Sequence, residues 1–316
     1  MAQVRPRLIV DCDPGHDDAV MLVLAARHAD VVGITTVSGN APLEACTTNA
    51  LAITELLGWD VPVHSGAARP LLAEPFHAPE VHGESGLDGT DLARPTRTVA
   101  GDDAVAFISE ATRAEEGLWL VATGPLTNVA LALRADPGLA GRLAGISFMG
   151  GGAGEGNVTA AAEFNVWADP EAAAIVVDAG CPVWMCGLDC TRQFLADRAL
   201  TDEVRALGNP VSGFLADIFD HELGRFGSYA TSSPDPPMHD PVALLAVTHP
   251  HLIQRERVPI LVETGGVHAR GATIVDRRLV TREGADPKAT SQTEWARSID
   301  APAARRVLVE TLASFG

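Results

Sequence analysis

The feature that most restricts the fold is the alternation of short segments rich in Val and Ile with longer segments rich in Ala and Leu. Such alternation is typical of βαβ units, in which helices join parallel strands. It predicts strands at 8–12, 31–37, 61–64, 118–122, 146–149, 183–186 and 258–262. It predicts helices at about 17–28, 42–57, 102–116, 126–135, 169–179, 197–207, 211–224 and 240–248, then a hairpin at 272–282 and a closing helix at 302–314. We therefore expect one α/β domain over residues 1–316, with an open, mostly parallel central sheet flanked by helices.

Two long segments, around residues 66–100 and 225–240, do not fit this alternation and are rich in Gly, Pro, Ser and His. Loops of this length in a compact domain are often lids or binding loops. In open α/β sheets, ligands bind beyond the carboxyl ends of the strands. We therefore expect the functional residues at strand ends, with these two segments as lid-like loops beside them.

The charge balance argues against several classes of function. The chain has 41 acidic and 23 basic residues, a formal net charge of −18, and Lys288 is its only lysine. Nucleic-acid affinity comes largely from Lys and Arg contacts to phosphates, so we expect no nucleic-acid partner. Apolar runs such as 19–26 are far shorter than the roughly 18 residues of a membrane span, so we expect no membrane partner. Five cysteines without a disulfide pattern favour the reducing cytoplasm.

Four aspartates lie close together around the end of the first predicted strand: Asp11, Asp13, Asp17 and Asp18. The tight turn at 14–15 allows their carboxylates to converge, and converging carboxylates repel one another unless a cation or shared protons compensate. Carboxylate oxygens suit a hard divalent ion, calcium or magnesium rather than zinc. The simpler alternative is two helix-capping and two solvated aspartates. For His16, between the acids, packing is favoured over metal ligation.

An Asp-x-Asp sequence after a first strand also occurs in haloacid dehalogenase-type phosphatases, which use the first aspartate as a nucleophile beside magnesium. That family needs a lysine against the phosphate, and Lys288 lies in a polar C-terminal segment rather than at a strand end. A P-loop is excluded because the chain has no Gly-Lys-Ser/Thr. A magnesium-dependent phosphatase is therefore the weaker alternative.

Seven motifs in order resemble those of the inosine-uridine-preferring nucleoside N-ribohydrolases. They are Asp11-Cys-Asp-Pro-Gly-His-Asp-Asp-Ala19, Val37-Ser-Gly-Asn40, His82-Gly-Glu-Ser-Gly-Leu-Asp-Gly89, Thr123-Gly-Pro-Leu-Thr-Asn128, Met149-Gly-Gly151, Ala162-Glu-Phe-Asn165 with Ala168-Asp-Pro-Glu171, and His239-Asp-Pro241. The resemblance implies the single-domain α/β fold of that family and calcium-dependent hydrolysis of the N-glycosidic bond of ribonucleosides to ribose and free base. It also implies a homo-oligomer, dimer or tetramer, with a role in salvage or catabolism of purine or pyrimidine nucleosides.

The resemblance also implies a role for individual residues at the metal. Calcium would be held by the side chains of Asp13, Asp18 and Asp240 and by the backbone carbonyl of Thr123. The ribose hydroxyls and one water would complete its coordination, and Asp13 would accept the proton of that water.

The substrate would contact a further set of residues, again by resemblance. The ribose diol would bind Asp17, Asn40 and Asn165, the 5′-hydroxyl would bind Asn157 and Glu163, Met149 would pack beneath the sugar, His239 would activate the leaving base, and His82 would line the base pocket. Tyr229, the only tyrosine, lies where related enzymes carry aromatics that contact the base, and both base contact and plain packing stay open for it. The base preference also stays open.

The chemistry of these residues agrees with such a reaction. Cleavage of the C1′–N bond places positive charge on the ribose, which an anionic pocket stabilises. Two alternatives remain: Asp240 and Glu163 could instead serve as polar residues at helix starts. A non-catalytic, calcium-dependent nucleoside-binding protein on the same fold would use the same residues.

Overall fold

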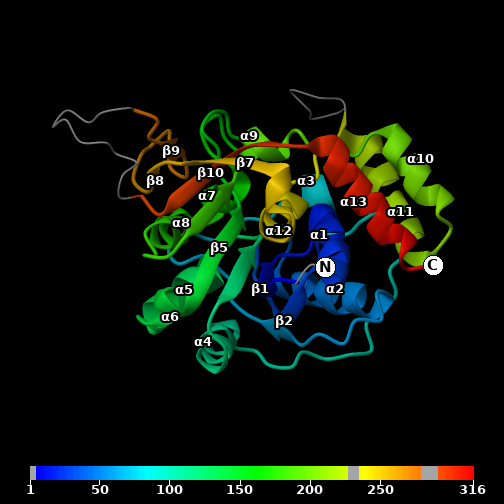
Figure 1. Ribbon diagram of the computed structural model, residues 1–316, viewed down its shortest axis with the longest axis horizontal. Helices are drawn as coiled ribbons and strands as arrows, with labels where there is room; N and C mark the ends of the chain where they lie inside the picture. The colour runs from blue at the N-terminus through cyan, green and yellow to red at the C-terminus, as the bar shows by residue number, and fades with distance from the viewer. Residues whose placement is uncertain (1–4, 227–234, 279–290) are drawn as a thin grey trace.

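The computed structural model describes residues 5–226, 235–278 and 291–316. Its centre is an eight-stranded sheet in the order β3-β2-β1-β4-β5-β6-β10-β7 (Figure 1). Neighbouring strands are parallel except β10 and β7, which pair antiparallel at one edge. The mostly parallel α/β sheet that the sequence predicts is therefore confirmed. The strands are β1 (Arg7–Cys12), β2 (Asp30–Thr36), β3 (Val63–Ser65), β4 (Leu118–Ala122), β5 (Leu143–Met149), β6 (Val183–Cys186), β7 (Ile253–Arg257), β8 (Ile260–Val262), β9 (Thr273–Val275) and β10 (Thr293–Ile299).

Helices cover both faces of this sheet (Figure 1). Leu8 and Val10 of β1 point into a core shared with α1, α2 and α10 to α13, whereas Ile9 points into a second core shared with α4, α5 and α8. Because side chains alternate along a strand, an apolar run in β1 supplies both cores. The helices are α1 (His16–His28), α2 (Leu43–Leu56), α3 (Pro79–His82), α4 (Ala104–Ala114), α5 (Thr127–Ala135), α6 (Leu139–Arg142), α7 (Phe164–Ala168), α8 (Pro170–Val177), α9 (Leu188–Thr191), α10 (Arg198–Ala206), α11 (Pro210–Phe226), α12 (Asp240–Thr248) and α13 (Ala301–Ala313), with a 3-10 turn at Pro250–Leu252.

Asp169 joins three segments that surround the carboxyl end of the sheet. Its carboxylate accepts hydrogen bonds from the backbone N–H of Ala172, which caps α8, from the N–H of Leu71, and from the hydroxyl of Thr127 at the start of α5. An aspartate before proline at a helix start is a favourable cap. Here it also holds the beginning of the long 66–100 segment against the sheet.

The C-terminal region departs from the sequence prediction in part. The strand predicted at 258–262 corresponds to β8, which begins only after Pro259, a residue with no N–H to donate to a sheet ladder, and which lies in a separate two-stranded sheet. The sequence pattern does not predict β7. Between β6 and β7 lies β10, which the pattern missed because Thr293–Ile299 is not a Val/Ile run. Part of the hairpin predicted at 272–282 lies outside the described residues, and the described strand β9 pairs with β8.

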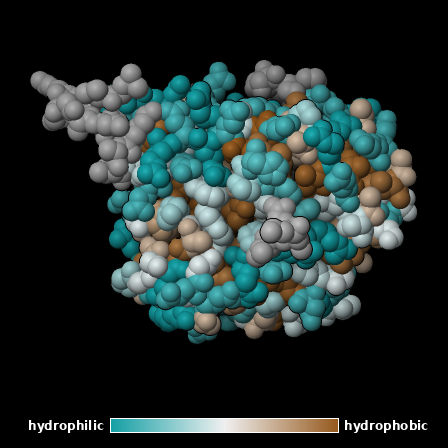
Figure 2. Space-filling view, in the orientation of Figure 1, coloured by the Kyte–Doolittle hydropathy of each residue, from teal (hydrophilic) through white to brown (hydrophobic). Residues whose placement is uncertain are grey.

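The viewed face is mostly hydrophilic, and its hydrophobic residues form separate patches (Figure 2). This agrees with a composition that is 20% charged and carries a net charge of −18. Within the described ranges, no helix is long and apolar enough to cross a membrane.

Candidate active site

A cavity of about 900 Å³ lies at the carboxyl ends of the central strands. Its walls come from the turns that follow β1, β2, β4 and β5, and from α3, α9, α11 and the start of α12. Ten of the residues predicted for the site line it: Asp17, Asn40, His82, Thr123, Met149, Asn157, Glu163, Asn165, His239 and Asp240. The fold thus brings together residues from seven separate motifs at the edge where ligands bind in open α/β sheets.

Asp13 lies fully buried beneath this cavity. Its Oδ2 accepts a hydrogen bond of 2.7 Å from the backbone N–H of Asn40, whereas its buried Oδ1 has no hydrogen-bond partner among the described residues. Gly39 and Gly124 pack against this carboxylate so closely that a Cβ would come within 2.0 Å and 2.6 Å of its oxygens. The glycines in the two motifs are therefore explained by the close approach of backbone to Asp13.

Asp18 is held in the first turn of α1 by three donors. Its Oδ1 accepts from the Thr123 hydroxyl at 2.7 Å, and its Oδ2 accepts from the Gly15 N–H at 2.9 Å and from the Asn40 amide at 3.2 Å. Asp240 is the first residue of α12 and not its N-cap, so its carboxylate is available to the cavity. One carboxylate oxygen from each of Asp17, Asp18 and Asp240 lies within 4.8 Å of the others.

The electrostatics of these acids are unfavourable without a counter-charge. Burial, followed by the charge of Asp18, raises the pKa of Asp13 well above its usual range. Burial and the charge of Asp17 raise the pKa of Asp18 to about 6. Burial and the charges of Asp17, Asp18 and Asp13 raise the pKa of Asp240 well above its usual range. Desolvated carboxylates with a mutual repulsion of this kind are stabilised by a bound cation.

The donor set fits a hard divalent cation. The converging groups are oxygen donors from Asp17, Asp18 and Asp240. Asp13 is not one of these three, and its Oδ1 is buried without a partner among the described residues. The backbone carbonyl of Thr123 also reaches this region, where it accepts a 2.7 Å hydrogen bond from the Asn165 amide and keeps a second lone pair. Oxygen donors of this type suit calcium or magnesium. The acidic cluster can therefore hold a metal ion.

The carboxylate of Glu163 is held in place by backbone groups, which the sequence context does not suggest. Its carboxylate accepts hydrogen bonds from the backbone N–H groups of Gly151, Asn165 and Val166, and it is the N-cap of α7. The helix-start alternative is therefore observed, although Glu163 also lines the cavity. Burial raises its pKa to about 7, opposed by the three N–H donors. Asn157, nearby, accepts from the Phe164 N–H at 2.9 Å.

His239 also lines the cavity, beside the acidic residues. Its Nδ1 lies 2.7 Å from the Thr191 hydroxyl, and its backbone N–H donates to Asp17 Oδ2 at 3.1 Å. Burial lowers the pKa of His239 below its usual range, which favours the neutral ring. His82 Nδ1 accepts from the His16 backbone N–H at 3.4 Å, and burial and the neighbouring His16 lower the pKa of His82 to about 4.

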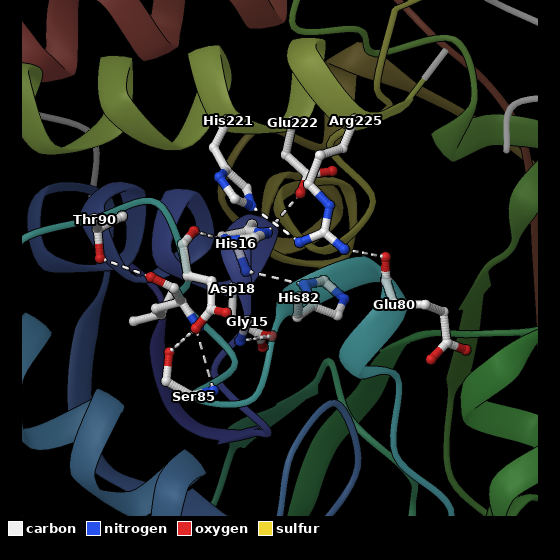
Figure 3. Close-up of polar contacts among 12 residues, drawn as sticks. Gly15, His16, Asp18, Glu80, His82, Ser85, Thr90, His221, Glu222 and Arg225 are labelled. Carbon is white, nitrogen blue, oxygen red and sulfur yellow. Dashed lines mark hydrogen bonds and ion pairs between the residues drawn. The ribbon is translucent and has the colours of Figure 1, made fainter. Parts of the chain in front are cut away.

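A second cluster, absent from the sequence predictions, connects α1 with α11 (Figure 3). His221, Glu222 and Arg225 extend from α11 toward His16. His16 Nδ1 pairs with Glu222 Oε1 at 2.7 Å, and its Nε2 lies 2.9 Å from the Asp88 carbonyl. Both ring nitrogens are therefore occupied, in agreement with packing and not with metal ligation for His16. Nothing in the sequence singles out Glu222, because the same helix also carries Asp217 and Asp220.

Asp11, one of the four aspartates around the end of the first predicted strand, has a structural role. Its buried Oδ1 accepts from the Thr35 hydroxyl of β2 and from the Asn128 amide of α5, which ties both elements to β1. Tyr229 lies outside the described residues.

Comparison with known proteins identifies the family of this chain. The family model described as inosine-uridine preferring nucleoside hydrolase matches residues 8–306. A pyrimidine-specific ribonucleoside hydrolase RihA from Escherichia coli O1:K1 is 42% identical over 287 residues, covering 90% of this chain and 92% of the relative.

Solved structures resemble the whole architecture. A purine-preferring ribonucleoside hydrolase from Gardnerella vaginalis has a TM-score of 0.90 at 30% identity, covering 98% of both chains. A plant nucleoside hydrolase, PpNRh1, has a TM-score of 0.91 at 27% identity, covering 98% of this chain and all of that one. With its acidic cavity in the same fold, this chain belongs to the inosine-uridine preferring nucleoside hydrolase family and is a nucleoside hydrolase.

Proposed function

We propose that this enzyme hydrolyses the N-glycosidic bond of ribonucleosides to ribose and free base in a calcium-dependent reaction. The observation that carries the proposal is the buried, unpartnered Oδ1 of Asp13 beneath a cavity lined by acids. Asp13, Asp18, Asp240 and the Thr123 carbonyl would hold the ion. When bound, calcium would lower the pKa of a coordinated water and bind the 2′- and 3′-hydroxyls of ribose.

We assign Asp13 as the general base. The assignment is supported by its Oδ1, which has no partner among the described residues, and by its Oδ2, which the Asn40 N–H holds in a defined orientation. The attacking water bonds to C1′ as the C1′–N electron pair departs with the base, and Asp13 accepts the proton of the water. The negative charges of the surrounding aspartates stabilise the oxocarbenium-like charge on the sugar.

The sugar would be oriented by polar groups that line the cavity. Asp17, Asn40 and Asn165 would bind the diol, and Met149 would pack beneath the ring. Asn165 is suited to this because its amide nitrogen is already fixed on the carbonyls of Thr123 and Met149. Its amide oxygen then faces outward as an acceptor.

The 5′-hydroxyl would bind at the edge formed by Glu163 and Asn157, which both line the cavity. The base would leave toward His239 and His82, and Tyr229 stays a candidate for contact with it. A departing base is stabilised by a hydrogen bond to the nitrogen that gains negative charge. A neutral His239 can give this general-acid assistance by donating the hydrogen bond from its ring N–H, while solvent supplies the proton to the released base.

We propose that pyrimidine ribonucleosides are preferred, because the 42% identical relatives are named pyrimidine-specific whereas the purine-preferring structure is 30% identical. The test is the initial rate of ribose release from uridine, cytidine, inosine, adenosine and guanosine. We expect uridine and cytidine to react fastest, and 2′-deoxyuridine to react slowly because it lacks a hydroxyl that the ion would bind. Tight nucleoside binding without ribose release would instead support the non-catalytic binding protein.

Replacement of His239 by alanine is expected to harm natural nucleosides selectively. Its loss should lower kcat/KM for uridine and inosine by about 100-fold or more, because general-acid assistance contributes on that order. The 4-nitrophenyl riboside, whose leaving group needs no proton, should lose much less. Equal losses on both substrates would contradict the leaving-group role.

Three broader properties complete the proposal. All five cysteines are buried and free, which supports a reducing cytoplasm. A homo-oligomer, dimer or tetramer, is proposed on family resemblance. A single domain is supported by the central sheet, which combines strands from β1 near the N-terminus to β10 near the C-terminus.

A further inference from the structure

We infer that Thr191 is a positioning residue for His239, holding the imidazole in the tautomer that presents Nε2–H to the leaving base. The inference rests on the proposed function, because it concerns how His239 assists the leaving group. It adds a residue from α9 that the sequence motifs did not assign.

The contact between the two side chains is short and enclosed. Thr191 Oγ1 lies 2.7 Å from His239 Nδ1, and Thr191 is fully buried. No other hydrogen bond involves the Thr191 hydroxyl among the residues that the structure describes. A buried hydroxyl with a single partner satisfies its O–H by donating it to that partner.

The direction of this hydrogen bond determines the proton on the other ring nitrogen. If Nδ1 accepts from Thr191, the neutral imidazole carries its proton on Nε2. His239 Nε2 makes no hydrogen bond to any described residue and is not one of the buried unpartnered atoms, so it is open to the cavity that His239 lines. The hydroxyl of Thr191 therefore leaves a donor, rather than an acceptor, facing the base.

The backbone of His239 is held as well. The His239 backbone N–H donates to Asp17 Oδ2 at 3.1 Å, so backbone and ring are fixed by groups on two different elements. Without the hydroxyl, both tautomers and other ring orientations become accessible. Only part of the molecules would then present a correctly placed donor, which weakens the hydrogen bond that stabilises the leaving base without removing the cavity.

The fold gives Thr191 this place through a close backbone approach. The short helix α9 begins directly after β6 at Gly187, where a Cβ would come within 2.6 Å of the Gly151 carbonyl. The Thr191 N–H bonds back to the Gly187 carbonyl at 3.1 Å. The turn after β6 thus places the Thr191 hydroxyl beside His239, the residue that precedes α12.

The test compares Thr191→Val, which replaces the hydroxyl with a methyl group of similar size, with Thr191→Ser, which keeps the hydroxyl. For Thr191→Val we expect kcat/KM for uridine to fall by about 10-fold to 100-fold, a part of the effect of general-acid catalysis, with kcat for the 4-nitrophenyl riboside within about 3-fold of the parent. Thr191→Ser should restore most of the lost uridine activity. Thr191→Ala, which also removes the hydroxyl, provides the same comparison if the valine variant does not fold.

The two substrates separate positioning from a structural effect. A merely structural role would lower both activities together in the valine and alanine variants, and that result would overturn the inference. Loss in Thr191→Ser equal to that in Thr191→Val would overturn it too, since the hydroxyl would then be irrelevant. His239→Ala could lose uridine turnover selectively while Thr191→Val does not. That result would refute the positioning role of Thr191 and leave the leaving-group role of His239 intact. If His239→Ala shows no selectivity, it is the proposed role of His239 that fails.

Discussion

Replacing Asp13 with asparagine is expected to lower kcat/KM for uridine by about 1,000-fold or more, because the variant loses the general base and one oxygen charge at the cation. Asparagine has nearly the same shape, so the Asn40 N–H can still bond to its amide oxygen in place of Asp13 Oδ2. The measurement is ribose release at saturating calcium. The matched control is Asp202→Asn, because Asp202 is exposed on α10 away from the cavity.

Although Asp13→Asn should lower activity, we expect it to raise the stability of the calcium-free protein. Burial and the charge of Asp18 penalise the ionised form of Asp13, so a neutral side chain relieves repulsion. In the presence of a chelator, Asp13→Asn should therefore melt at a higher temperature than the parent, while calcium should raise its Tm less. An active, calcium-stabilised Asp13→Asn enzyme would contradict both the general-base and the metal-ligand assignments.

Removal of calcium is expected to abolish ribose release and to lower the Tm, with restoration on adding calcium back. At a calcium concentration about 100 times the dissociation constant, binding contributes about 2.7 kcal/mol to the free energy of unfolding. For a chain of this size that corresponds to several degrees in Tm, on the order of 5 °C. Full activity after exhaustive chelation would reject the calcium requirement.

The stabilisation by calcium should also depend on pH. The folded-state pKa of Asp18 is about 6 and those of Asp13 and Asp240 are also raised, so between about pH 4 and pH 6 the folded, ion-free protein binds more protons than the unfolded chain. The stability that these protons provide is present below the unfolded pKa and is lost as pH rises through the folded pKa. Calcium compensates for this loss, so the Tm gain should be larger at about pH 7.5 than at about pH 5.

The histidines change folding stability with pH in the opposite direction to the carboxylates, and they serve as an internal check. Burial lowers the pKa of His28 and of His82 to about 4, so each favours folding above its unfolded pKa of about 6.5 and loses that contribution as pH falls. His28 lies away from the cavity, against His249 and Thr311, and acts equally with and without calcium. The His28 contribution therefore cancels in the difference between the two melting profiles, which reports the carboxylates together with the cavity histidines His82 and His239. A calcium effect that is independent of pH would argue against the carboxylate cluster as the binding site.

Much of the sheet could be predicted from local sequence because each strand carries its own pattern. In β1 the apolar run fills two cores, and the tight turn and aspartates after it place α1 within one residue of its predicted start. In β10, by contrast, the sequence Thr293–Ile299 mixes charged and small residues, and it is a strand because β6 and β7 flank it. Strand identity there depends on pairing between segments that are distant along the chain, which local periodicity does not report.

In the candidate site, too, some residues can be predicted from the sequence and others only from the structure. Sequence motifs named ten residues that line the cavity, because their chemical types and spacing are local properties. Glu163 illustrates what motifs leave out, since its carboxylate also organises three backbone N–H groups. Thr191 and Glu222 had no motif of their own, and their importance comes from partners far along the chain, His239 and His16.

By itself, the sequence determined the α/β class, the approximate helices and strands, and the convergence of aspartates after the first strand, because apolar periodicity and tight turns act over a few residues. The tertiary structure alone decided which distant side chains meet. The order of strands in the sheet brings the ends of β1, β4 and β5 and the starts of α9 and α12 to one edge. At that edge, burial raises the pKa of Asp13 and Asp240 and leaves one oxygen of Asp13 without a partner among the described residues. Burial and long-range hydrogen bonds depend on the path of the whole backbone, so only the tertiary structure turns a local run of acids into a buried acidic cluster that can hold a metal ion, with His239 beside it.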